Sequence, residues 1–137
     1  MDILIINGPN LNLLGKRQPS IYGDKSFEEY IQGIQKEGVD ISVYQSNVEG
    51  EIINKMHNSK VEGIILNAGG YTHTSVAIRD AVSAIETPVI EVHISNISAR
   101  ETFRHESLIS PVADGCVFGF GMMGYEMAVD YFLKMRK

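Results

Sequence analysis

The sequence predicts an α/β fold with a five-stranded parallel sheet that is covered by helices on both faces. Short apolar runs alternate along the chain with segments whose apolar residues recur at helical spacing, which is typical of βαβ units. The runs at residues 3–6 and 63–66 are apolar or glycine at every position, as expected of strands buried on both faces. The 137 residues contain no repeat, low-complexity tract or linker, so we expect one domain over residues 1–137.

Five runs predict the strands. The first ends at residues 7–10, Asn-Gly-Pro-Asn, a cluster of turn-forming residues that cannot continue a central strand. The second run is less apolar than the first, so we place it nearer an edge of the sheet. Pro88 begins the fourth strand, at the position where proline is tolerated. The expected strands are residues 3–6, 41–44, 63–66, 88–94 and 115–118.

Helical patterns fill the intervals between these strands. Capping boxes, which are signals for a helix start, occur at residues 26–29 and 98–101. The first opens a helix that should end near Gly38, and the second opens one that runs towards His105. The other expected helices are residues 48–59, a helix capped by Thr74 or Ser75 that runs to Ile85, and a last helix with the stripe Tyr125, Ala128, Val129 and Phe132.

Right-handed crossovers between five strands favour the flavodoxin-like strand order 2-1-3-4-5. In such sheets, ligands bind beyond the carboxyl ends of the strands, at the switch point between the first and third strands. Polar side chains gather at this edge: Asn7 and Asn10 after the first strand, Asn67, Tyr71 and His73 after the third, and Glu91, His93 and Ser95 on the fourth.

Composition limits the classes of partner. The formal net charge is −5 and no block of Lys or Arg occurs, which argues against nucleic acid and anionic membranes. An anionic ligand would therefore need a few local cationic groups. No apolar run approaches membrane-spanning length, and Met1-Asp2 lacks the basic region of a leader. The single Cys116 excludes an internal disulfide and suits a reducing compartment, so we expect a soluble cytoplasmic protein.

Glu91 and His93 are two positions apart in one strand and so share a face. A carboxylate in a covered strand is unfavourable unless it is paired, and a Glu that holds an imidazole and favours its protonated form explains both residues. An edge strand with one wet face would make them routine. A metal site is the competing interpretation, but the four His show no HxxxH or HExxH spacing, and we expect no metal.

Three further features have two interpretations each. Arg100 and Arg104 share a face of the expected helix, whose first amides, with those of Ile94 and Ser95, could bind a carboxylate or phosphate; surface ion pairs are the alternative. Asp80 faces outward from its helix, as a surface acid or a contact with another subunit. Residues 119–124 match GxGxxG, but no strand follows to carry a ribose-binding acid, so we interpret them as a close turn into the last helix.

Residues 15–23 form a polar loop with a glycine at each end, which is either a mobile lid or an ordinary surface loop. It carries Lys16, Arg17, Ser20 and Tyr22.

Other proteins with this fold lack support at the residues that matter. The turn after the first strand is a poor substitute for the hydroxyl-rich phosphate loop of a flavodoxin. Asn67 stands where a receiver domain needs an aspartate. His57, His105, Cys116 and the Met residues are expected to be surface or core residues.

Five segments together resemble type II 3-dehydroquinate dehydratase. They are INGPNLNLLGKR at 6–17, YG at 22–23, NAGGYTH at 67–73, EVHIS at 91–95 and RExFR at 100–104. Each is weak alone, but five in order at compatible spacing are specific, and they span essentially the whole chain. The resemblance implies one catalytic domain that dehydrates 3-dehydroquinate reversibly to 3-dehydroshikimate. It also implies a place in the shikimate pathway, no metal or organic cofactor, and a homo-oligomer, a dodecamer built from trimers.

The resemblance also implies a role for each site residue. Tyr22 would be the base, and Arg17, with Arg100 assisting, would lower the phenol pKa. Asn10 would hold a water against the enolate oxygen, and His93, oriented by Glu91, would protonate the leaving hydroxyl. Substrate contacts would come from Asn67, His73, Arg100, Arg104, the amides of Ile94 and Ser95, and Asp80 of a neighbouring subunit. The rival classes are a non-catalytic anion binder and a flavin- or nucleotide-binding protein.

Overall fold

A computed structural model describes residues 1–14 and 26–136. Its strands form one sheet in the order β2-β1-β3-β4-β5, and every neighbouring pair is parallel. The predicted flavodoxin-like order is therefore confirmed, with the less apolar strand at an edge. The strands are β1 (Asp2–Asn7), β2 (Asp40–Gln45), β3 (Gly63–Asn67), β4 (Val89–His93) and β5 (Gly115–Phe118).

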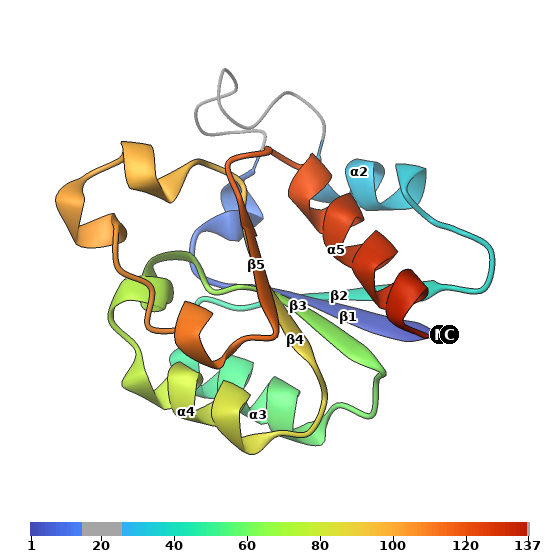
Figure 1. Cartoon of the computed structure of the whole chain (residues 1–137), viewed down its shortest axis with the longest axis horizontal. Coiled ribbons are helices and arrows are strands. Elements are labelled where there is room, and N and C mark those ends of the chain that lie inside the picture. The colour runs from blue at the N-terminus through green and yellow to red at the C-terminus, as the bar shows by residue number, and fades with distance from the viewer. Residues whose placement is uncertain (15–25, 137) are drawn as a thin grey trace.

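Helices cover both faces of the sheet (Figure 1): α2 and α5 lie over one face, and α3 and α4 lie over the other. Strand side chains alternate between the two layers. Ile3, Ile5 and Ile65 pack with α2 and α5, whereas Leu4, Ile6 and Leu66 pack with α3 and α4. These helices are α2 (Phe27–Gly33), α3 (Glu49–Asn58), α4 (Val76–Ala84) and α5 (Met123–Met135). None of the helices in the described part of the chain has the length and apolarity needed to cross a membrane.

Two predicted helix starts are confirmed by their caps. The hydroxyl oxygen of Ser26 accepts a hydrogen bond from the Glu29 N–H, and that of Ser75 accepts one from the Ile78 N–H. The predicted end of α2 near Gly38 is wrong. The helix ends at Gly33, where the Ile34 N–H turns back to the Ile31 carbonyl in a tighter, 3₁₀-type bond.

The helix predicted from the second capping box does not form. Residues 97–104 contain two single 3₁₀ turns, η3 (Ile97–Ala99) and η4 (Thr102–Arg104), separated by extended backbone at Arg100 and Glu101. The side chain of Asn96, not that of Ser98, accepts the Ser98 N–H. Glu101 binds arginine side chains instead of reaching back to a backbone N–H. Arg100 and Arg104 therefore share no helix face, and the expected N-terminal cradle of helix amides is absent from this described stretch.

The ends of β1 and β3 approach each other closely at the switch point. The Gly8 N–H donates a 2.7 Å hydrogen bond to the Asn67 carbonyl. A Cβ atom on Gly8 would lie 2.5 Å from the carbonyl oxygen of Ala68, which is closer than atoms can pack. Glycine is therefore required where the two polar strand ends meet.

Candidate active site

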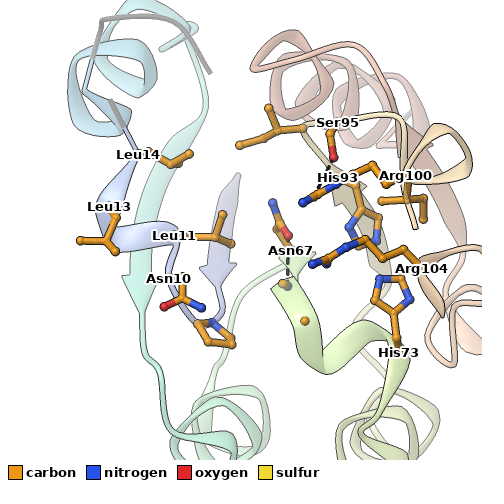
Figure 2. A pocket seen from close by; sticks show the side chains of 15 residues that line it. Asn10, Leu11, Leu13, Leu14, Asn67, His73, His93, Ser95, Arg100 and Arg104 are labelled. Carbon is orange, nitrogen blue, oxygen red and sulfur yellow. Dashed lines mark hydrogen bonds between the residues drawn. The ribbon is translucent and has the colours of Figure 1, made fainter. Parts of the chain in front are cut away.

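A cleft of about 180 Å³ opens at the carboxyl ends of β1, β3 and β4, where the topology rule predicts a ligand site. Figure 2 shows its two sides, with the segment after β1 on one and the residues after β3 and β4 on the other. The predicted site residues that line it are Asn10, Asn67, His73, His93, Ile94, Ser95, Arg100 and Arg104. Leu11, Leu13 and Leu14 supply an apolar wall.

Glu91 and His93 form a buried ion pair on the α4 side of β4. Oε2 of Glu91 lies 2.6 Å from Nε2 of His93, and only 1% of Glu91 and 5% of His93 are exposed. The intervening Val92 points into the opposite layer, with α5. The predicted pairing across one strand face is thus confirmed. The wet-edge alternative is wrong, since β4 lies between β3 and β5.

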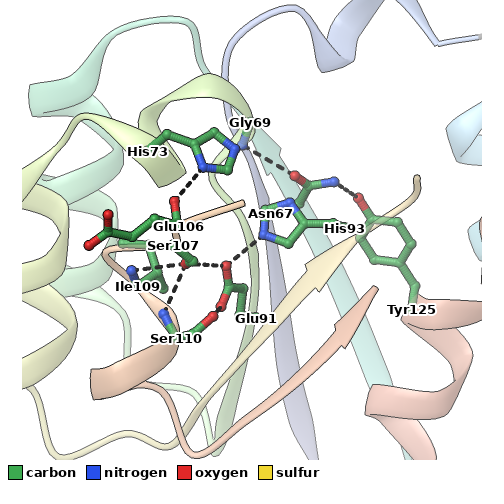
Figure 3. Close-up of polar contacts among 10 residues, drawn as sticks. All are labelled: Asn67, Gly69, His73, Glu91, His93, Glu106, Ser107, Ile109, Ser110 and Tyr125. Atoms are coloured by element: carbon green, nitrogen blue, oxygen red, sulfur yellow. Dashed lines mark hydrogen bonds and ion pairs between the residues drawn. The ribbon is translucent and has the colours of Figure 1, made fainter. Parts of the chain in front are cut away.

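Two serines complete the surroundings of the Glu91 carboxylate (Figure 3). The Ser107 hydroxyl donates to Oε2 at 2.7 Å, and the Ser110 hydroxyl donates to Oε1. Ser107 Oγ in turn accepts the N–H groups of Ile109 and Ser110, so its own proton is directed to Glu91. Burial alone would raise the pKa of Glu91, but the hydrogen bonds from His93, Ser110 and Ser107 outweigh it and lower the pKa.

The ionised carboxylate fixes the protonation of His93, because Nε2 must carry a hydrogen to donate to it. The tautomer of His73 is fixed in a similar way, by a backbone carbonyl. Its Nδ1 lies 2.7 Å from the Glu106 carbonyl oxygen, which can only accept, so Nδ1 carries the hydrogen. The two rings stack with centroids 6.4 Å apart and planes inclined by 24°. Two oriented imidazoles thus line one wall of the cleft.

Asn67 ends β3 and is almost fully buried at the base of the cleft. Its Oδ1 accepts the Gly69 N–H at 3.2 Å, and its Nδ2 donates to the Tyr125 hydroxyl at 2.9 Å. That hydroxyl donates in turn to Oδ1 of Asn7 at 2.8 Å. Asn7 and Asn67 are register partners in β1 and β3, so both point into the layer that contains α5.

Arg100 and Arg104 bring positive charge to the cleft from the segment after β4 (Figure 2). A guanidinium nitrogen of Arg100 donates to the Ser95 hydroxyl at 3.3 Å. Nε of Arg104 donates to Glu101 at 3.1 Å. The two arginines therefore converge although no α-helix joins them. They supply the local cationic groups that an anion needs in a chain whose net charge is −5.

Asn10, which lines the cleft, is held in an unusual backbone conformation. Its φ of 71° is the one positive value among described residues other than glycine, and asparagine tolerates this region better than most residues. Its N–H donates to the Asn47 side chain. Asp80 is exposed on α4 beside Arg79 and is not among the residues that line this cleft. Arg17 and Tyr22 lie outside the described residues.

The arrangement combines two guanidinium groups, two oriented imidazoles and a buried amide around one small cavity. Such a set suits binding of a small carboxylate that also carries hydroxyl groups. The imidazole of His93 is a group that could transfer a proton to such a ligand. Among residues 1–14 and 26–136, no three His, Cys, Asp or Glu side chains are grouped as metal ligands.

Comparison with known proteins identifies the family. A family model for dehydroquinase class II matches residues 1–133. The 3-dehydroquinate dehydratase of Francisella philomiragia subsp. philomiragia is 55% identical over 133 residues, covering 94% of this chain and 92% of the relative. The chain belongs to the class II dehydroquinase family.

Other class II dehydroquinases agree in sequence and in fold. The 3-dehydroquinate dehydratase of Clostridium perfringens strain SM101 is 52% identical over 137 residues, covering 95% of this chain and 94% of the relative. The crystal structure of the type II dehydroquinase from Butyrivibrio crossotus matches with a TM-score of 0.91 at 45% identity, covering 97% of each chain. This class II dehydroquinase is accordingly a hydro-lyase, a type II 3-dehydroquinate dehydratase.

Sequence reasoning on this class II dehydroquinase missed three residues that hold the site in place: Ser107, Ser110 and Tyr125. A buried Glu implies hydrogen-bond donors, but nothing in the sequence tells which of the loop serines reach it. Tyr125 was predicted as a core residue from its helical stripe, which is confirmed. The hydrogen-bonding role of its hydroxyl could have been inferred from Asn7 and Asn67, because two buried amides on neighbouring strands require a polar partner from the covering helix.

Proposed function

We propose that this enzyme converts 3-dehydroquinate to 3-dehydroshikimate reversibly through an enolate, with a tyrosine base and a histidine acid. The observation that carries the proposal is the Glu91–His93 pair, buried beside two arginines in one cleft. Removal of a proton next to a ketone, followed by loss of a β-hydroxyl, needs a base, an enolate stabiliser and an acid. The proposal requires neither a metal nor an organic cofactor.

His93 is the proposed acid, which delivers a proton to the leaving hydroxyl. Glu91 holds the ring through Nε2, so the other ring nitrogen, Nδ1, is the one left to face a ligand. The ionised carboxylate also balances the charge of the imidazolium before the proton is transferred. Ser107 and Ser110 support this role, because Ser107 donates to the oxygen that pairs with His93 and Ser110 donates to the other carboxylate oxygen.

Tyr22 is the proposed base, and Arg17 is the group that favours its phenolate form. Support for these roles comes from sequence position. Leu14 lines the cleft, and an extended chain of eight residues spans up to roughly 26–29 Å, so Tyr22 is within reach of the cavity. Arg100 reaches the cavity from the opposite side and would assist Arg17. Asn10, which lines the cleft, would hold a water against the enolate oxygen.

The remaining polar groups bind the substrate in this proposal. Arg104 and the backbone N–H groups of Ile94 and Ser95 would bind the carboxylate, for which a guanidinium fork is suited. Asn67 and His73 would bind hydroxyl groups. Asn67 has one Nδ2 hydrogen committed to Tyr125 and a second left over, and His73 has Nδ1 committed to the Glu106 carbonyl and Nε2 left over. Both line the same cavity as His93.

The test is turnover measured separately from binding in three variants. We expect Tyr22→Phe and His93→Ala to lose turnover while binding of 3-dehydroshikimate, measured by calorimetry, is largely kept, because each change removes a group that acts in the transition state. Arg17→Lys should also be severe, since a point charge cannot replace a planar fork. Wild-type rates in Tyr22→Phe or His93→Ala would refute the assigned roles.

We further propose that residues 1–137 act as one catalytic domain in the cytoplasm and assemble as a dodecamer built from trimers. Asp80 would then reach the site of a neighbouring subunit. Its exposure on α4, with a side chain that is 65% accessible, leaves it free to do so. Sizing by light scattering tests the assembly, and titration of substrate into Asp80→Ala tests the contact. A monomer with full activity would contradict both statements.

A further inference from the structure

We propose that Tyr125 is a positioning residue for substrate binding, which fixes the orientation of the Asn67 amide so that an N–H group is presented to the cleft. This inference rests on the proposed function for its substrate, and on three polar side chains for its geometry. Asn7, Asn67 and Tyr125 come from β1, β3 and α5, and their side chains form one continuous chain of hydrogen bonds. Tyr125 has no contact with the cleft of its own.

The direction of every hydrogen bond in this chain follows from one backbone group. The Gly69 N–H can only donate, so the Asn67 atom that faces it must be the carbonyl oxygen, Oδ1. The nitrogen, Nδ2, must then face Tyr125, and the phenol oxygen accepts from it. The single phenol proton is left for Asn7, whose facing atom is therefore its oxygen. Figure 3 shows Asn67 between Gly69 and Tyr125.

The phenol is well suited to hold this arrangement. Tyr125 is fully buried, and its ring packs edge-on against Phe27 with centroids 4.9 Å apart. Burial raises the pKa of the phenol well above its ordinary value, so the proton stays on the oxygen at neutral pH. Glycine at position 124 also favours close packing of α5 on the sheet, because a Cβ atom there would lie 3.3 Å from Cγ1 of Val92.

The consequence lies at the second hydrogen on Nδ2 of Asn67. One Nδ2 hydrogen is used by Tyr125, and the other has no acceptor among the described residues. Asn67 lines the cleft, so this hydrogen is available to a ligand oxygen there. If the amide were flipped, an acceptor would take its place and the Gly69 N–H would face another N–H group. The Gly69 N–H sets this orientation of the amide and Tyr125 holds it, so Asn67 is a committed donor towards a substrate hydroxyl.

The test uses Tyr125→Phe, which keeps the ring and removes the hydroxyl. We expect KM for 3-dehydroquinate to rise roughly three- to tenfold, the value of about one hydrogen bond, with kcat within about twofold of wild type, because the Asn67 contact is made in ground and transition states alike. Val129→Ala is the matched control. It lies one turn further along the buried face of α5 and should lower stability without changing KM.

A double-mutant cycle separates this role from a merely structural one. In an Asn67→Ala background, or Asn67→Ser if the alanine variant does not fold, Tyr125→Phe should have no further effect on KM. Additive effects, or a folded Tyr125→Phe with wild-type KM, would overturn the inference. A crystal structure of Tyr125→Phe gives an answer without turnover: the Asn67 amide should leave Gly69 or adopt several conformers. An unmoved amide would overturn the inference, whereas an inactive wild type would contradict only the proposed function.

Discussion

Oε2 of Glu91 and Nε2 of His93 lie 2.6 Å apart on one face of β4, in the buried layer between the sheet and α4. The same carboxylate accepts the hydroxyls of Ser107 and Ser110, which belong to the loop before β5. A buried charge is stable only when its oxygen atoms are all satisfied in this way. The pair therefore arrives at the cleft already oriented, and the loop that carries the two serines contributes directly to the site.

Glu91→Gln should lower kcat by less than His93→Ala does. The amide can still accept a hydrogen bond from Nε2 but cannot balance an imidazolium, so the proposed acid, His93, would be oriented but weakened. General acid catalysis contributes typically about 100- to 10,000-fold, and His93→Ala should lose an effect of this order. Steady-state kinetics of the two variants, with circular dichroism as the control for folding, provides the comparison. Equal kcat in Glu91→Gln and wild type would argue against the pairing.

The pH dependence of stability should report on Glu91. Its pKa in the folded protein is below the ordinary value of 4.5, so folding favours its ionised form. This contribution to stability is fully present above pH 4.5 and is lost as the pH falls through the folded-state pKa. Urea unfolding of wild type and Glu91→Gln from about pH 5 to about pH 3 should show the advantage of wild type shrinking. An advantage that is constant over this range would contradict the assignment.

Ser107→Ala should weaken both the fold and the reaction. The change removes a donor from Glu91 and an acceptor from the N–H groups of Ile109 and Ser110. Unsatisfied buried groups of this kind cost about 1–3 kcal/mol each, and kcat should fall because His93 is held less firmly. Ser98→Ala, at an exposed position of η3, is the control and should be near neutral. Thermal unfolding and kinetics of both variants test this, and an unaffected Ser107→Ala would be inconsistent with the network.

Gly8→Ala should be strongly destabilising. The new methyl group would meet the Ala68 carbonyl at 2.5 Å, and backbone on both sides prevents it from moving away. Overpacking typically costs about 1–3 kcal/mol, and the strain would displace Asn67, which precedes Ala68 at the end of β3. Gly50→Ala is the control, because it lies in α3 with open space around it and should gain about 0.5–1 kcal/mol in helix stability. Similar unfolding midpoints for the two variants would contradict the close approach.

Much of the fold could be predicted because local signals agree with the tertiary structure. The apolar runs have the length of a strand and are too short to form a helix. Ser26 and Ser75 cap their helices as their sequence context predicts. The Glu91–His93 pair could be predicted because the two-residue period of a strand fixes which side chains share a face.

The loop after β4 could not be predicted, because its signals compete. The capping box at residues 98–101 fits a helix, but Asn96 takes the Ser98 N–H and arginines take Glu101. Each of these contacts is as local as the one that the motif predicts.

The hydrogen bonds of Tyr125 with Asn7 and Asn67 could not be predicted for another reason. Its partners are 58 and 118 residues away, and a helical stripe predicts burial of the ring without showing where the hydroxyl points.

We propose that this cleft dehydrates 3-dehydroquinate through an enolate on protein side chains alone. The most direct measurement is the ultraviolet absorbance of purified, chelator-treated protein mixed with 3-dehydroquinate, with and without borohydride. We predict a growing signal from the conjugated enone product that neither treatment abolishes. Loss of activity with borohydride would indicate a lysine Schiff base, loss with chelator would indicate a metal, and no signal from folded protein would contradict the claim altogether.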